Sequence, residues 1–226
     1  MLILAHERGV HASADDGRSW LSLSPATGLP PVPTDDVAIH PRDNALVLGT
    51  HGRGIWILDD LAPLELLTPD TLARDAALAP IAPARQMVLH TPQAWFGQGM
   101  FFGPNPDFDA SVYYYLRNAA AGPVQIEIND ARGRLVRTLQ GPSAKGINRA
   151  KWDLRADPPA QGQVADQPAG RGGRGPAAPL VPPGTYQVVL KIPGPAPREL
   201  LGEVIVEKDP IVGNANRPPG VRAASR

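Results

Sequence analysis

Short apolar runs separated by polar turns fill the first sixty residues of the chain. Each run is three to six residues long and is bounded by Gly, Pro, Asn, Asp or charged residues. Runs of this kind are typical of β-strands joined by tight turns. The pattern therefore predicts strands at 2–5, 9–12, 21–23, 36–40, 45–50 and 55–59.

Two stretches of this region repeat each other. LILAHERGVHAS (2–13) and LVLGTHGRGIWIL (46–58) both have an apolar run, then a turn with His and Arg that ends in Gly, then a second apolar run. The turn glycines, Gly9 and Gly54, are 45 residues apart. A repeat of this length with several strands is typical of a β-propeller blade. We expect residues 1–62 to form about one and a half to two terminal blades.

The chain changes character after residue 62. Residues 63–85 are interrupted by prolines, and we predict a linker or strap with at most one helical turn, around 69–75. A second β-rich region follows at 86–210, and its number and spacing of strands are typical of an immunoglobulin-like sandwich. Its predicted strands lie at 86–90, 111–117, 124–129, 134–139, 146–154, 185–192 and 198–207.

Two further segments are predicted to lie outside the packed strands. Residues 156–179 are rich in Gly, Pro and Ala and are expected to form a low-complexity insertion in the sandwich. The polar tail, 211–226, is expected to be disordered. The overall prediction is an all-β protein, with a partial β-propeller followed by an immunoglobulin-like β-sandwich.

Composition supports this prediction and narrows the function. Gly (23) and Pro (27) make up more than a fifth of the chain, as expected for an all-β protein with many turns. Acids and bases balance at 22 each, so net charge gives no sign of nucleic-acid or anionic-membrane binding. The absence of cysteine excludes disulfides, thiolate catalysis and Cys-type zinc sites. No apolar run approaches a membrane span, and the N-terminus lacks the pattern of a signal peptide.

The stretch SADDGRSW (13–20) combines two acids, a glycine and a tryptophan. Ser13 and Asp15 have short side chains that can accept hydrogen bonds from nearby backbone N–H groups, and Gly17 can take a positive φ. Trp20 is then expected to pack its large apolar surface under the hairpin. The alternative is catalysis by Asp15 and Asp16 as an acid–base pair. Adjacent residues on an extended chain point to opposite sides, which favours the structural turn.

Other side chains are candidates for ligand contact. His51 and Arg53 lie in the turn HGRG, which is either a ligand-contacting loop or a solvated hairpin. Trp95 and Phe96, with Phe101 and Phe102 nearby, lie in a loop where they either stack on a sugar or partner, or seal the sandwich against the propeller.

Two other kinds of site are not expected. Alternation sends Tyr113 and Tyr115 to one face of a strand and Tyr114 to the other, which favours core and surface roles over a tyrosine nucleophile. No HxH or HExxH pair occurs among the histidines, so no metal site or cofactor is predicted; the histidines are at 6, 11, 40, 51 and 90.

The motifs above resemble a known family. Ser13, Asp15, Gly17 and Trp20 match the Asp-box, or BNR, motif of sialidases, xyloglucanase-type glycosidases and sortilin-like propellers. GTHGRGIWILDDL resembles the closing blade of bacterial sortilin-like BNR-repeat proteins, which are often labelled glycosyl hydrolases. In the second region, the stretches that resemble the immunoglobulin-like domain of the flagellar hook-capping protein are YYYLR, VQIEINDARGRLVRTL, GINRAKWDLR and PPGTYQVVL.

The resemblance implies a non-catalytic structural and binding role. It implies the C-terminal region of a longer, extracellular or periplasmic propeller protein, whose partners are its remaining blades and a polysaccharide or peptide. Two alternatives are a glycoside hydrolase with its catalytic residues on the missing blades and a sortilin-like scaffold for peptides or proteins. Glycosidases need two carboxyl groups roughly 5–10 Å apart. Because no convincing pair is evident, we expect this chain alone to hydrolyse no glycoside.

The low blade count has a consequence for folding. A propeller cannot close on two blades, and repeats need neighbours to bury their faces. We therefore expect residues 1–60 not to fold alone, whereas 80–212, with the sandwich strands, should.

Overall fold

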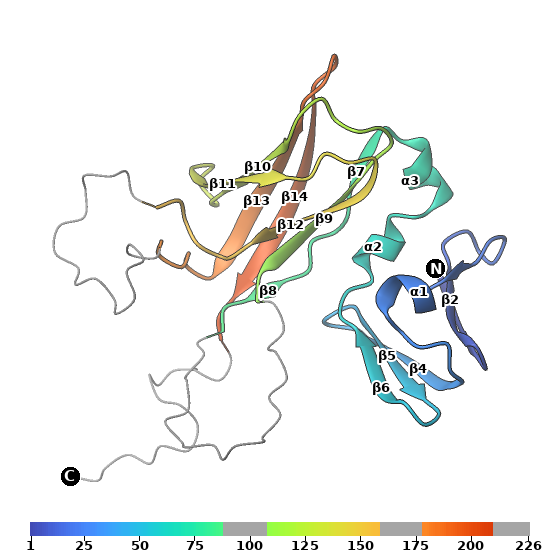
Figure 1. Ribbon diagram of the computed structural model, residues 1–226. Helices are drawn as coiled ribbons and strands as arrows, with labels where there is room; N and C mark the ends of the chain where they lie inside the picture. Colours follow the sequence, from blue (N-terminus) through green and yellow to red (C-terminus); the bar gives the residue numbers. More distant parts are fainter. Residues whose placement is uncertain (88–107, 159–177, 210–226) are drawn as a thin grey trace, which may run out of the picture.

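The computed structural model describes residues 1–87, 108–158 and 178–209, and within these ranges strands predominate (Figure 1). The strands form a small N-terminal unit, blue to cyan in the figure, and a larger sandwich, green to red. The prediction of an all-β chain with a partial propeller followed by a sandwich is confirmed.

The N-terminal unit consists of two antiparallel sheets of three strands each. The first sheet has the order β1 (Leu2–His6), β2 (Gly9–Ser13), β3 (Leu21–Ser22). The second has the order β4 (Thr34–His40), β5 (Ala45–Thr50), β6 (Gly54–Leu58). A short helix, α1 (Ser24–Thr27), lies between the two sheets in the sequence. The predicted strands of this region are all present.

Each sheet turns one face towards a shared core. The buried residues of this core are Val10, Ala12, Leu23, Leu29, Leu46, Leu48 and Leu61. Alternate residues of the outermost strands pack against it: Ile3 and Ala5 from β1, and Trp56 and Leu58 from β6. The residues between them on each strand point to the opposite face of the sheet.

The sandwich packs a five-stranded sheet on a three-stranded sheet. The larger sheet has the order β11-β10-β13-β14-β8 and the smaller has β12-β9-β7. The strands that were predicted are β9 (Ala110–Leu116), β10 (Val124–Asn129), β11 (Leu135–Gly141), β12 (Gly146–Trp152), β13 (Gly184–Ile192) and β14 (Arg198–Glu207). Trp152, Tyr114, Ile126 and Leu190 are among the fully buried side chains between the sheets.

The segment 63–85 is not only a linker, which corrects the predicted boundary. It contains β7 (Ala76–Leu78), which pairs with β9, and β8 (Ala84–Arg85), which pairs in parallel with β14. Both strands are too short to show a period in the sequence, and backbone pairing with longer strands fixes them. The sandwich therefore begins near residue 76. No strand is present in the described part, 86–87, of the strand predicted at 86–90; β8 lies directly before it, and residues 88–90 lie outside the described residues.

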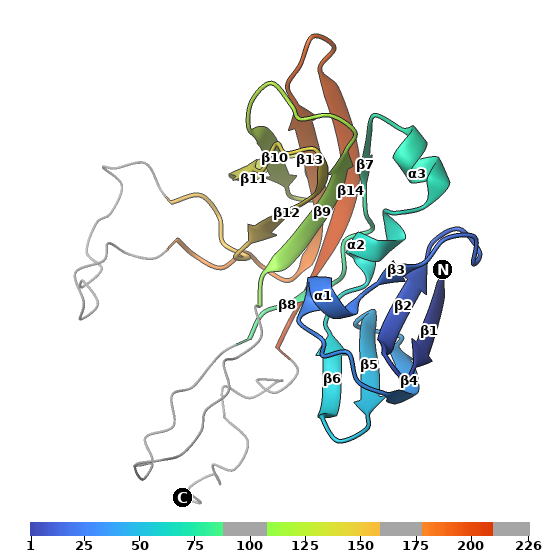
Figure 2. The same cartoon turned by 45° about the vertical axis from the view of Figure 1, so that its right-hand side comes forward.

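Two short helices connect the units. They are α2 (Ala62–Glu65) and α3 (Pro69–Ala73), and α3 falls where one helical turn was predicted. The Thr68 hydroxyl accepts a hydrogen bond from the backbone N–H of Thr71 at 3.2 Å and caps α3. Ala62 and Leu66 pack with Tyr115 of β9 in a small buried cluster. This cluster joins the N-terminal unit to the sandwich (Figure 2).

The ends of the predicted insertion 156–179 lie side by side. The backbone N–H of Ala156 donates to the carbonyl of Pro179 at 3.0 Å, and Arg155 forms a β-bridge with Leu180. The interior of the insertion, the aromatic loop and the tail 211–226 lie outside the described residues.

Candidate functional site

The loop of the Asp-box motif is closed by its own side chains. The buried Ser13 hydroxyl accepts a hydrogen bond from the backbone N–H of Gly17 and donates one to Asp15, both at 2.8 Å. Asp15 also accepts from the N–H (2.8 Å) and the hydroxyl (2.6 Å) of Ser19. Asp16 and Gly17 have φ of 58° and 88°. The hydrogen bonds, those from Ser19 foremost, lower the pKa of Asp15 to about 2. An ionised, saturated carboxylate of this kind is suited to holding a turn and not to donating a proton.

Trp20 does not pack under the hairpin as predicted. Its side chain is 42% exposed, and its Nε1 donates to the carbonyl of Gly17 at 3.1 Å. The ring also lies against Gly17, since a Cβ there would be 3.7 Å from it. The indole is therefore tied to its own loop and leaves an apolar surface exposed.

Of the other predicted contact residues, the structure describes His51 and Arg53, which share one exposed turn. His51 lies in the β5–β6 turn with its Nδ1 3.6 Å from Asp35, and both side chains are well exposed. Arg53, in the same turn, is exposed, and its carbonyl accepts from Trp56 Nε1 at 3.1 Å. Trp95 and Phe96 lie outside the described residues.

The three consecutive tyrosines alternate between faces, as predicted. Tyr114 is fully buried in the sandwich core, and its hydroxyl donates to the carbonyl of Pro142. Burial raises the pKa of Tyr114 to about 12, which opposes a role as an ionised nucleophile. Tyr113 lies on the other face under the guanidinium of Arg149, 5.5 Å from the ring centre. Tyr115 shares that face in the cluster with α2.

Two histidines meet across the first hairpin, which the search for short sequence motifs missed. His6 Nε2 lies 2.9 Å from His11 Nδ1. The backbone N–H of Arg8 donates to His6 Nδ1 at 3.2 Å, so in neutral His6 the proton is on Nε2 and is donated to His11. Within the described residues, no three His, Cys, Asp or Glu side chains are grouped to hold an ion.

A cleft of about 720 Å³ with mixed polar and apolar walls lies between the second blade sheet and the sandwich. Two ion pairs lie at its walls: Arg42 with Asp43 at 2.7 Å, and Arg85 with Glu207 at 3.1 Å. The half-buried Asp60 also lines the cleft, and burial raises its pKa. One oxygen of Asp60 accepts from the N–H of Ala62 at 2.9 Å at the start of α2.

On the second face of each blade sheet, one edge strand carries exposed apolar side chains. Leu2 and Leu4 of β1 are 45% and 48% exposed, and Ile55 and Ile57 of β6 are 75% and 59% exposed. Antiparallel sheets that meet water on one face normally carry polar residues there. Strands that are apolar on both sides are typical of sheets covered on both faces. We call Leu2 and Leu4 the first outer face, and Ile55 and Ile57 the second; Ile57 also lines the cleft towards the sandwich.

The repeat also shows which strands each sheet lacks. When the sequence is shifted by 45 residues, β1 aligns with β5 and β2 aligns with β6. In the second sheet β4 precedes β5, and in the first sheet β3 follows β2. Among the described strands, none corresponds to β4 beside β1, and none corresponds to β3 beside β6. Among the described strands, β1 and β6 are therefore edge strands that pair on one side only.

Comparison with models of known protein families and with curated proteins gives no match to this chain. The helices in the described ranges are too short and too polar for any of them to span a membrane.

Proposed function

We propose that residues 1–62 are the terminal blades of an Asp-box β-propeller, and that the chain is the non-catalytic structural and binding region at the C-terminal end of a larger sortilin-like BNR-repeat protein. The observation that carries this proposal is the incompleteness of the two blade sheets. Each has three strands and one edge strand with exposed apolar side chains, and the first sheet lacks the strand at one end of the blade while the second lacks the strand at the other end.

Aligning the two repeats gives a blade of four strands. β4 is the first strand, β5 or β1 the second, β6 or β2 the third, and β3 the fourth. The first sheet supplies the last three strands and the second supplies the first three. Additional blades would pair their backbones with β1 and β6 and cover the two outer faces. Burying a Leu or Ile side chain contributes about 1.5–3 kcal/mol, so each covered face is a substantial source of binding energy.

The sandwich has an anchoring role in this proposal. It holds the blade unit through α2 and Tyr115, while β1 lies at the far side of the blade unit from it (Figure 2). An extracellular or periplasmic location, and a polysaccharide or peptide ligand for the whole propeller, belong to the same proposal and rest on the motif resemblance.

Sedimentation velocity of the purified chain tests whether the outer faces dock other sheets. We expect reversible self-association at concentrations on the order of 10–100 μM, because the exposed faces of different copies cover each other. Leu4→Glu and Ile57→Glu should each shift the chain towards the monomer, with the fold retained.

Leu201→Glu is the matched control. Leu201 is 66% exposed on β14 of the sandwich, so it has a similar exposed apolar side chain but belongs to neither outer face. Association should persist in this variant. A wild-type chain that stays monomeric, or a Leu201→Glu effect as large as that of Ile57→Glu, would count against the blade-docking proposal.

A further inference from the structure

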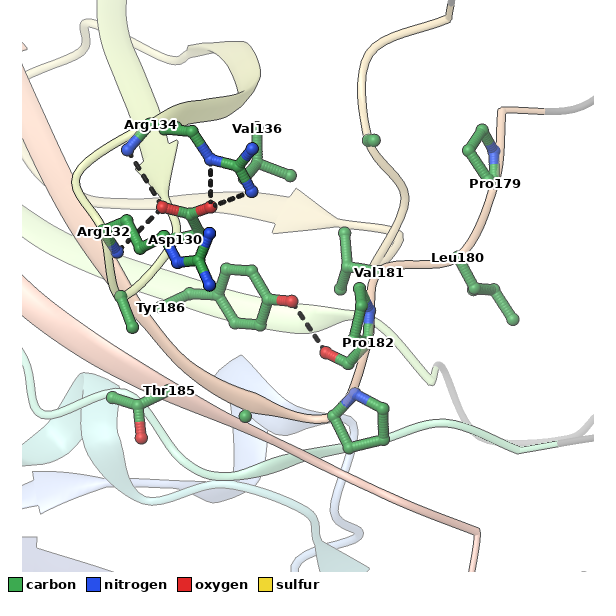
Figure 3. Close-up of a pocket in the computed structure, with 14 residues that line it drawn as sticks. Asp130, Arg132, Arg134, Val136, Pro179, Leu180, Val181, Pro182, Thr185 and Tyr186 are labelled. Carbon is green, nitrogen blue, oxygen red and sulfur yellow. Dashed lines mark hydrogen bonds and ion pairs between the residues drawn. The ribbon is translucent and has the colours of Figure 1, made fainter.

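A second cavity lies at the end of the sandwich, away from the blades. Its volume is about 380 Å³, and it opens between the β10–β11 turn and the segment that leads into β13. Figure 3 shows the turn residues Asp130, Arg132 and Arg134 on one side and Pro179 to Pro182 on the other. This volume is in the range of small-molecule sites in proteins.

The wall formed by Pro179 to Pro182 is fixed by backbone hydrogen bonds. The N–H of Val181 donates to the carbonyl of Leu154 at 2.9 Å, and the carbonyl of Pro179 accepts from Ala156 at 3.0 Å. The Val181 carbonyl accepts from the side chain of Gln86 at 2.5 Å. The cavity is therefore shaped before any ligand arrives, which lowers the entropic cost of binding.

The interior of the cavity is apolar. Val181 and Tyr186 are buried, and the Tyr186 ring packs edge-on against Trp152 with the ring centres 5.4 Å apart. The Tyr186 hydroxyl donates to the carbonyl of Pro182 at 2.7 Å, so its polar end already has an acceptor (Figure 3). Val136 and Leu180 add further apolar surface.

The rim carries one positive charge that is not balanced. Asp130 accepts from the backbone N–H groups of Arg132 (2.9 Å) and Arg134 (3.0 Å) and forms an ion pair with the Arg134 guanidinium at 2.7 Å. These contacts hold the pKa of Asp130 below its usual value. The guanidinium of Arg132 has no hydrogen bond or ion pair within the described residues. Asp130 is the one acidic residue among those that line the cavity, and Arg134 neutralises it.

We propose that this cavity binds a small apolar monoanion, an aromatic or short alkyl carboxylate. The apolar body would lie against Val181 and Tyr186, and the carboxylate would accept hydrogen bonds from the Arg132 guanidinium. A planar guanidinium with several parallel N–H donors matches a carboxylate in charge and geometry. This proposal is independent of the proposed blade docking, because it uses the sandwich alone.

An NMR titration of the whole ¹⁵N-labelled chain with phenylacetate tests the proposal. The backbone amides of 131–136 and 184–186 should shift in a saturable manner, since they surround the cavity. Phenylacetamide has the same shape without the charge and should bind about tenfold more weakly, because a charge-assisted hydrogen bond is lost.

Arg132→Glu should lower the phenylacetate affinity by at least about tenfold, since the charge at the rim is reversed. Arg132 is exposed in a turn, so the fold should be retained, and the dispersion of the same spectra checks this. Arg117→Glu, an exposed arginine outside the cavity, should bind like the wild type. Absence of shifts at these amides, equal binding of the amide, or unchanged affinity in Arg132→Glu would each overturn the proposal.

Discussion

Asp15 links the stability of the blade unit to pH. Its pKa is about 2 in the folded chain, against an ordinary value of 3.8, because Ser19 and Ser13 hydrogen-bond to the ionised form. A carboxyl group whose pKa is lowered on folding stabilises the fold above its unfolded pKa, and this contribution is lost as the pH falls towards the folded value. The loss should therefore occur between about pH 4 and pH 2.

The Asp15→Asn variant isolates this contribution. The difference in unfolding free energy between the wild type and Asp15→Asn should be largest above pH 4 and should shrink towards pH 2. Urea unfolding at a series of pH values, followed by tryptophan fluorescence, measures it. Asp16→Asn is the control, because the Asp16 carboxylate takes no part in the loop's hydrogen bonds. A difference for Asp15→Asn that stays constant across this range would contradict the assignment.

Hydrogen bonds within a short motif could be predicted from the sequence, whereas the contacts of its side chains with distant parts of the chain could not. The hydrogen bonds of Ser13 and Asp15 reach partners within four residues, so the spacing of the motif contains them. Whether Trp20 is buried or exposed depends on residues far from it in the sequence, which the motif does not contain. The contact between His6 and His11 depends on the register of β1 and β2, which no HxH or HExxH search could detect.

At the scale of elements, β7 should make the sandwich more stable. It pairs with β9, and Leu78 packs against the sandwich core, while Asp75 forms an ion pair with Arg198 at 2.5 Å. A fragment 68–209 should therefore be more stable than 80–209, by about 2–4 kcal/mol for the lost apolar burial and strand pairing. Thermal unfolding of the two fragments measures this. Equal stability would mean that β7 is dispensable and that residue 80 is an adequate boundary.

The strands that could be predicted from the sequence are those in which polar and apolar residues alternate. Residues 124–129 alternate in polarity, and β10 alternates in burial in the same way. Ala76–Leu78 has three apolar residues and no alternation, so its role as a strand follows from pairing with distant β9. Short helices such as α2 have too few residues to show a helical period, and packing against Tyr115 fixes them.

At the scale of the whole molecule, the two blade sheets resemble consecutive segments of a ring. They share one core, while Leu2, Leu4 and Ile55 are exposed on their other faces and β1 and β6 are edge strands. Heterologous surfaces of this kind join unit to unit until a ring closes. The strand pattern and the 45-residue repeat predicted the blades. Only the sheet order shows that the first sheet lacks an equivalent of β4 and the second lacks an equivalent of β3.

The central claim is that these blades function within a larger propeller. The most direct test is the mass of the native polypeptide in the source organism, detected with an antibody raised against the sandwich. We expect a polypeptide much larger than the 24.0 kDa of this chain. A native polypeptide of 24.0 kDa that sediments as a free monomer would contradict it.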